Sequence, residues 1–164
     1  MAVEGMDRLR ARFRALPKEI RQAVRDEMER AAEDYVALMR RLAPRGKSGK
    51  LAASIGWTWG DAPSGAIVVQ QMYGDGPTNI DMRITIFAGS DEVFYARFVE
   101  FGTRAHALAL NASVERGKRQ DQGGWHPGAT AQPFFFPAVR AKKRTTTRRI
   151  NATAVKAARR IWGG

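Results

Sequence analysis

The segment PKEIRQAVRDEMERAAEDYVALMRRLA, residues 17–43, has the most regular pattern in the chain. Its apolar residues recur at steps of three and four with charged residues between them, which is the period of a helix with one buried face. Proline is tolerated in the first turn of a helix but not in its middle. We therefore predict that residues 1–43 are helical, with a break at Pro17 between a short and a long helix that ends before Pro44.

Strand patterns follow this helical part. Residues 55–59, 66–73 and 81–88 are rich in apolar, β-branched and aromatic residues, and turn residues separate them. The last segment alternates apolar and other residues with a period of two, which predicts one buried face. We predict an antiparallel sheet over residues 55–88 whose strands lie in sequential order, as a meander.

The second half of the chain is less regular. Residues 92–102 predict a short helix that Gly102 ends in a left-handed conformation. Residues 104–132 have no sustained period, which predicts a long irregular loop. Residues 137–162 predict a basic C-terminal helix that begins at Pro137, with a bend or frayed segment at its three consecutive threonines.

Length and composition set the fold class. A chain of 164 residues with 44% hydrophobic residues can bury a sizeable core as one domain. We predict a single α+β domain over residues 1–164, in which the N-terminal and C-terminal helices pack on a small antiparallel sheet. No apolar run is long enough to span a bilayer and the N-terminus lacks a signal-peptide core, so we expect synthesis and assembly in the cytoplasm and no membrane partner.

The positive charge is concentrated at one end. The net charge is +12, and residues 122–164 carry nine basic and no acidic side chains. Such a block attracts phosphates or acidic protein surfaces. One interpretation is a nucleic-acid-binding module that uses the C-terminal helix, although no base-stacking or groove-reading motif accompanies the cations. A second is a solvated basic face that keeps the monomer soluble. A third is that Arg148 and Arg149 contact an acidic protein partner.

The sequence contains no plausible catalytic or cofactor-binding set. His106 and His126 lie 20 residues apart with no acidic residue at metal-ligand spacing, so we interpret them as hydrogen-bonded loop residues, His126 fixing a turn. A phosphate loop at Gly46 would need a glycine where Arg41 stands. No nucleophile elbow is present and there is no cysteine. We expect a protein that is not an enzyme and holds no cofactor or metal.

Aromatic clusters provide the strongest candidates for a binding surface. Three consecutive phenylalanines, 134–136, cannot all face one core, so at least one is expected to reach another surface. Glu100, an acidic residue in an apolar segment, is expected to pair with Arg97, with Arg104 or with a neighbouring subunit. Trp57 and Trp59 are explained by core packing. The predicted interface residues are Tyr95, Phe98, Glu100, Phe101, Gly102, Pro133, Phe134, Phe135, Phe136, Arg148 and Arg149.

Three motifs in order also resemble a known family. They are SGKLAASI at residues 48–55, after an Ala-Pro pair, YARFVEFGT at residues 95–103, and QPFFFPA at residues 132–138, after a Pro-Gly pair. Together they resemble the siphophage tail-component family, the tail-completion or head-to-tail joining proteins in the neck of long-tailed phages. Residues 104–124 are longer than this family pattern.

The resemblance implies a non-enzymatic virion protein with an α+β subunit. It implies a homo-oligomeric ring, six-fold, at the head-proximal end of the tail, around the channel through which DNA is ejected. The implied partners are the neighbouring neck and tail-tube proteins, with non-specific contact to packaged DNA. The implied location is the virion, after assembly in the host cytoplasm.

Overall fold

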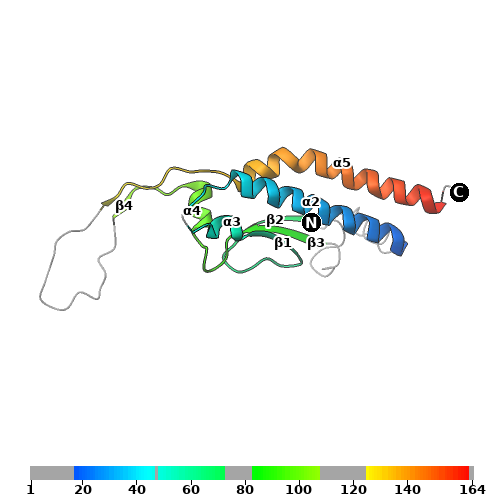
Figure 1. Ribbon diagram of the computed structural model, residues 1–164, viewed down its shortest axis with the longest axis horizontal. Helices are drawn as coiled ribbons and strands as arrows, with labels where there is room; N and C mark the ends of the chain where they lie inside the picture. The colour runs from blue at the N-terminus through cyan, green and yellow to red at the C-terminus, as the bar shows by residue number, and fades with distance from the viewer. Residues whose placement is uncertain (1–16, 47, 73–82, 108–124, 163–164) are drawn as a thin grey trace, which may run out of the picture.

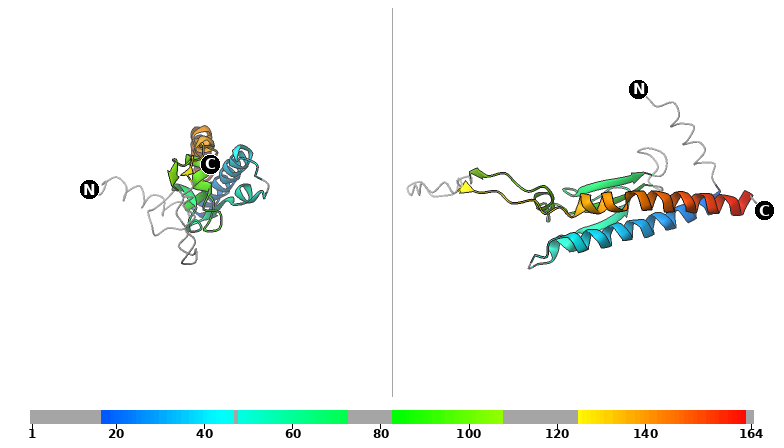
Figure 2. Two further views of the ribbon diagram at one scale, coloured as in Figure 1. Left: turned by 90° about the vertical axis from the view of Figure 1, so that its left-hand side faces the viewer. Right: turned by 90° about the horizontal axis from the view of Figure 1, so that it is seen from above.

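Two long antiparallel helices and a small sheet make up the body of the molecule. The computed structural model describes residues 17–46, 48–72, 83–107 and 125–162 (Figure 1). Helices α2 (Lys18–Leu42) and α5 (Phe135–Trp162) lie side by side over most of their length, and their contact is more extensive than that of any other pair of elements (Figure 2). The sheet packs against α2 through its first and third strands. The predicted α+β class is confirmed.

Helix α2 forms where the apolar period predicts it. The backbone N–H groups of Ile20 and Arg21 donate to the carbonyl of Pro17, and the N–H of Ala43 donates to Met39 at the other end. Its buried residues occur in every turn, because the helix contacts both α5 and the sheet: Ile20, Val24, Glu27, Met28, Ala31, Ala32, Tyr35, Val36 and Met39. The short helix predicted before Pro17 lies outside the described residues.

The sheet has three antiparallel strands: β1 (Ile55–Trp59), β2 (Ile67–Met72) and β3 (Arg83–Ala88). Their order is β1-β3-β2, with β3 paired to both neighbours. The predicted sequential order is therefore wrong, since the last strand occupies the centre.

The central position of β3 accounts for its burial. Ile84 and Ile86 face the core as the period of two predicts, but Thr85 between them is buried as well. The Thr85 hydroxyl donates to the carbonyl of Gly60, so a polar side chain is accommodated inside. A strand with neighbours on both edges is shielded more completely than its alternating pattern suggests.

Two short helices flank the sheet. Helix α3 (Lys50–Ala53) precedes β1, and α4 (Ala96–Phe101) follows β3. Helix α4 is shorter than predicted because the residues from Asp91 to Tyr95 form turns, in which the N–H of Val93 donates to Ser90.

A two-stranded arm leaves the body between α4 and α5. Strands β4 (His106–Ala107) and β5 (Trp125–His126) pair antiparallel, and a bridge joins Thr103 to Ala129 nearer the body. Figure 1 shows the arm extending away from both helices. The prediction of an irregular loop is wrong for these paired residues, and residues 108–124 lie outside the described part.

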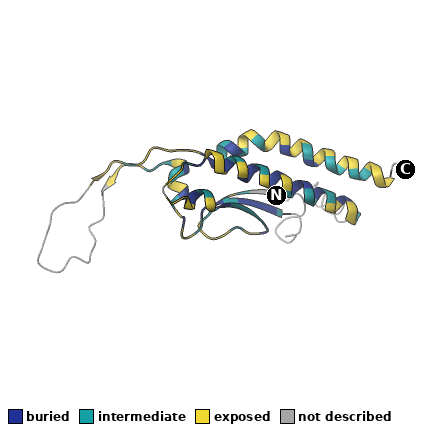
Figure 3. Ribbon diagram, in the orientation of Figure 1, coloured by how far each residue is buried: buried dark blue, intermediate teal, exposed yellow. Residues whose placement is uncertain are grey.

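Helix α5 begins at Phe135, two residues earlier than predicted, and Pro137 lies within its first turn. The helix continues through its three threonines without a break, so the predicted bend is wrong. Thr146 is buried and the Thr147 hydroxyl donates to the carbonyl of Lys143. Packing along a partner helix outweighs the low intrinsic propensity of threonine. The side of α5 turned away from α2 is largely exposed (Figure 3).

Candidate assembly surface

Glu100 of α4 caps the N-terminus of α5. Its Oε2 atom accepts the backbone N–H groups of Phe134 at 2.7 Å and Phe135 at 2.8 Å, and its Oε1 atom accepts that of Phe136 at 3.0 Å. The first N–H groups of a helix have no partner within it, and the positive end of the helix dipole favours a carboxylate. Glu100 is thus buried inside the subunit, and the pairing predicted with Arg97 or Arg104 is not formed.

The carboxylate fixes the three phenylalanines in different environments. Phe134 and Phe135 are fully buried in the core. Phe136 is half-buried, and its ring centroid lies 5.8 Å from that of Phe101. Two of the three rings hold the start of α5 in the interior, and the third packs against that core with part of its surface exposed.

Gly102 lets the chain leave α4 tightly. Its φ is +71° and its N–H donates to the carbonyl of Phe98. This φ lies in the left-handed region that favours glycine, as predicted, and the ψ of 179° is extended. A Cβ at this position would lie 2.6 Å from the carbonyl oxygen of Ala129 and 2.9 Å from the nitrogen of Ala131. Both the conformation and the space require glycine.

Three exposed rings line one side of α4 and the turn before it. Phe94, Phe98 and Phe101 are 59%, 46% and 60% exposed, and the rings of Phe94 and Phe98 meet edge to face at 6.0 Å. We call these three residues with Phe136 the aromatic ridge. Phe94 was missed in the sequence analysis, although its spacing of four and seven residues from Phe98 and Phe101 is that of a helical stripe.

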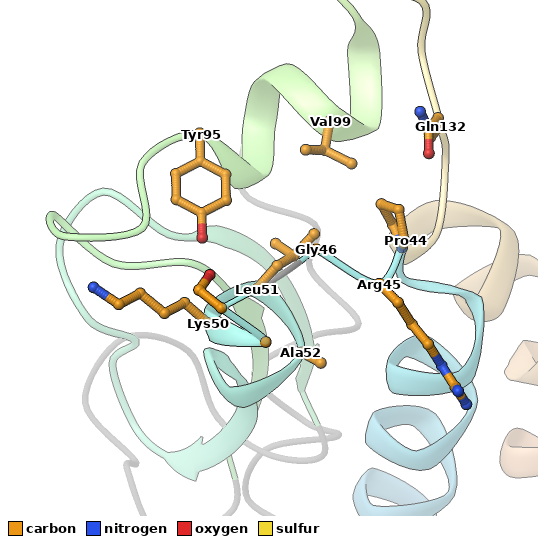
Figure 4. Close-up of a pocket in the computed structure, with 11 residues that line it drawn as sticks. Pro44, Arg45, Gly46, Lys50, Leu51, Ala52, Tyr95, Val99 and Gln132 are labelled. Carbon is orange, nitrogen blue, oxygen red and sulfur yellow. The ribbon is translucent and has the colours of Figure 1, made fainter.

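A groove of about 820 Å³ lies on another side of α4. Figure 4 shows Val99 of α4 and Tyr95, which immediately precedes that helix, facing Leu51 across the opening, with Pro44 and Gln132 closing one end. Tyr95 is thus part of this groove rather than of the ridge. The lining residues are Pro44, Arg45, Gly46, Ser48, Gly49, Lys50, Leu51, Ala52, Tyr95, Val99 and Gln132.

A smaller hollow adjoins the ridge. It has a volume of about 440 Å³ and is lined by Glu100, Phe101, Pro133, Phe136 and Arg140. Pro133 is exposed at its edge. The ridge is therefore bordered by a recess instead of projecting from a flat surface.

The two arginines predicted to bind a partner have different environments. Arg149 joins α5 to α2, because its Nε donates to Glu27 at 2.7 Å and its NH1 group pairs with Asp34. The hydrogen bond to Asp34 raises the pKa of Arg149 above its ordinary value, against the opposing effect of desolvation. Arg148 is exposed and forms no ion pair with a described residue. Arg149 therefore holds the subunit together, and Arg148 is free to meet a partner.

The two histidines face each other across the arm. His106 and His126 are paired in register, and their rings stack with centroids 5.1 Å apart. The Nδ1 atom of His126 accepts the N–H of Gly128 at 3.0 Å, so His126 fixes a turn as predicted. Across the described ranges, no cluster of three or more possible metal-ligating side chains occurs.

The tryptophans of β1 face α2. The indole N–H groups of Trp57 and Trp59 donate to Glu33 and Glu29 at 2.6 and 3.0 Å, and Arg25 lies over the Trp59 ring. The two rings are partly exposed, so core packing alone does not explain them. The pair of glutamates four residues apart on α2 serves these two donors.

A family model described as "Bacteriophage HK97-gp10, putative tail-component" matches residues 7–102, more than half of the chain. The chain belongs to this family. No curated protein and no solved structure matches it. As a phage tail component, the protein belongs to the virion, where it contacts other virion proteins.

The matched range of the HK97-gp10 family covers α2, the sheet and α4, and it ends at Gly102. Three rings of the aromatic ridge and most of the groove lie within it. The arm, α5 and the third motif, residues 132–138, lie beyond it. Among the described residues, no helix has both the length and the apolar character that crossing a lipid bilayer requires.

Proposed function

We propose that this tail component is a non-enzymatic structural protein that forms a homo-oligomeric ring at the head-proximal end of the tail, where it completes the tail for joining to the head. The observation that carries the proposal is the aromatic ridge. Exposed aromatic clusters of this kind are typical of protein interfaces and not of monomer surfaces.

The ridge is also rigid, which supports an assembly role. Phe101 lies one residue from the glutamate that caps α5, and Phe136 follows two phenylalanines that are fully buried. A preorganised anchor loses little conformational entropy when it binds. The sequence motifs and the family match point to the same role in a phage tail.

The basic face of α5 supports contact with acidic surfaces of neighbouring neck or tail-tube proteins. Arg140, Lys143, Arg144 and Arg148 are exposed, and residues 122–164 contain no acidic side chain to neutralise them. A strongly basic channel wall would retard DNA that has to leave quickly. We therefore favour a position on the outside of the ring or between rings.

Complementation of a phage that lacks the gene tests this function. Phe98→Asp should leave the subunit folded, since the side chain is exposed, but should yield heads and tails that do not join. The matched control is Val155→Asp on α5, another half-exposed apolar residue. Normal yields of infectious particles with Phe98→Asp would contradict the assembly role of the ridge.

The second candidate function, nucleic-acid binding by α5, is favoured by the same exposed cations. The variant Arg148→Glu separates the two. Impaired head–tail joining with normal ejection from completed particles supports the protein partner. Normal joining with altered ejection, together with DNA affinity that falls steeply with salt, supports the nucleic-acid alternative.

A further inference from the structure

We infer that the aromatic ridge of one copy inserts into the groove of the next copy, in a head-to-tail contact to which α4 contributes residues on both sides. This inference rests on the proposed ring and names the surfaces that build it. The ridge residues are Phe94, Phe98 and Phe101, with Phe136 beside them, and the groove is the 820 Å³ hollow beneath Tyr95 and Val99.

The two surfaces lie on different sides of one short element. Neighbouring positions on a helix point about 100° apart, so Phe98 and Val99 face different directions. A two-fold contact could place each ridge in the groove of the other copy, but it stops at a dimer. The proposed ring requires a heterologous contact, in which the ridge of each copy binds the groove of the next and the series closes when the rotation between copies is suitable.

The apolar surfaces are complementary in kind. The floor of the groove contains Leu51 and Ala52, and Val99 overhangs it. On the copy that would bind this groove, three exposed rings lie in one row. They belong to Phe94, Phe98 and Phe101, which are four and three residues apart in the sequence. This is how an amphipathic helix occupies an apolar groove, and such a contact would bury the exposed part of each ring.

The charges around both surfaces are of opposite sign. Asp91 and Glu92 are exposed immediately before the first ridge residue. Arg45 and Lys50 lie at opposite rims of the groove, and none of its lining residues is acidic (Figure 4). Within the described ranges, none of these four groups forms an ion pair in its own subunit. When the ridge of a second copy enters the groove, Asp91 and Glu92 of that copy can therefore pair with Arg45 and Lys50 at the rims.

Disulfide trapping tests the contact directly, because the chain has no cysteine of its own. A mixture of the single variants Phe98→Cys and Ala52→Cys should form disulfide-linked dimers on mild oxidation. The double variant should form a covalent ladder that ends at the size of the closed ring. Rapid disulfide formation by Phe98→Cys alone would indicate a ridge-to-ridge contact and overturn the inference.

A mixing experiment provides the second test. Phe98→Asp removes the ridge, Ala52→Trp fills the groove, and Lys50→Glu reverses a rim charge without touching the core. Phe98→Asp and Ala52→Trp should each weaken self-association about 30-fold, as loss of a central interface residue does, and the rim variant Lys50→Glu should weaken it by a smaller factor. Phe98→Asp mixed with Ala52→Trp should give a one-to-one heterodimer and no ring on native mass spectrometry, because one intact ridge meets one intact groove.

The outcomes separate this inference from the proposed function. Wild-type protein that stays monomeric at high concentration refutes the ring itself. Rings that persist in both Ala52→Trp and Lys50→Glu refute the groove but leave the ring in place. Loss of the ring in Trp125→Asp, with rings retained in Phe98→Asp, would assign the groove to the arm of the neighbouring copy and overturn the role of the ridge.

Discussion

Replacing Glu100 by glutamine should strongly destabilise the subunit, although the two side chains have nearly the same shape. In the wild type, two carboxylate oxygens accept three backbone N–H groups at distances of 2.7, 2.8 and 3.0 Å. A glutamine can accept through one oxygen and presents an NH₂ group in place of the other. At least one N–H at the start of α5 then faces another donor.

The magnitude follows from two losses. Leaving a buried donor without a partner costs about 1–3 kcal/mol. Removing a negative charge from the positive end of a helix costs up to about 2 kcal/mol in a partly buried setting. We expect the free energy of unfolding to fall by about 2–4 kcal/mol, a large part of the 5–15 kcal/mol that is typical of a domain.

Urea unfolding followed by circular dichroism measures this change, with the slope of the transition checked for constancy. The control is Glu92→Gln. Glu92 is an exposed carboxylate in the turn before α4, the helix that carries Glu100, and its replacement should change the free energy of unfolding by less than about 0.5 kcal/mol. Hydrogen exchange should be faster at the amides of Phe134 and Phe135 in the Glu100 variant. A loss within the range of the control would refute the capping argument.

Three further variants test other contacts of the body. Gly102→Ala should lower the free energy of unfolding by at least about 1–3 kcal/mol from backbone strain, because its Cβ would also collide with the carbonyl of Ala129; an unchanged thermal midpoint would show that the turn relaxes without cost. Arg149→Met should cost about 1–3 kcal/mol in urea unfolding because it removes the ion pairs to Glu27 and Asp34, whereas Arg148→Met should stay within about 0.5 kcal/mol; equal effects would contradict their different environments. Trp59→Phe should cost about 1 kcal/mol by removing the indole donor, and a stability equal to that of the wild type would mean that this hydrogen bond contributes nothing net.

The regular elements could be predicted because their periods are local. The stripe of α2 and the alternation of β3 require no knowledge of distant residues, and both elements form within a few residues of their predicted bounds. The order of the strands in the sheet depends on which strands pair with each other, and the local sequence pattern of a strand does not indicate its pairing partners. The continuity of α5 through Thr146 also depends on a distant partner helix.

The site was predictable in part for the same reason. The segments around Phe98 and Phe136 could be selected from their aromatic density and from the family motifs. The division of the three phenylalanines at 134–136 into core and surface could not, because it depends on Glu100, a residue about 35 positions earlier that determines where α5 begins. The different environments of Arg148 and Arg149 could not be predicted for the same reason. Arg149 is paired because Glu27 and Asp34 of α2, more than 100 residues earlier, lie next to it.

The dependence of α5 on α4 and α2 bears on how the protein is synthesised. Helix α5 leaves the ribosome after every other described element, and until then α2 lacks its most extensive contact and Glu27 lacks its partner Arg149. Phe101 likewise lacks Phe136, so the aromatic ridge is incomplete on a nascent chain. The proposed contact between copies therefore requires a subunit in which α5 has already been made and packed on α2.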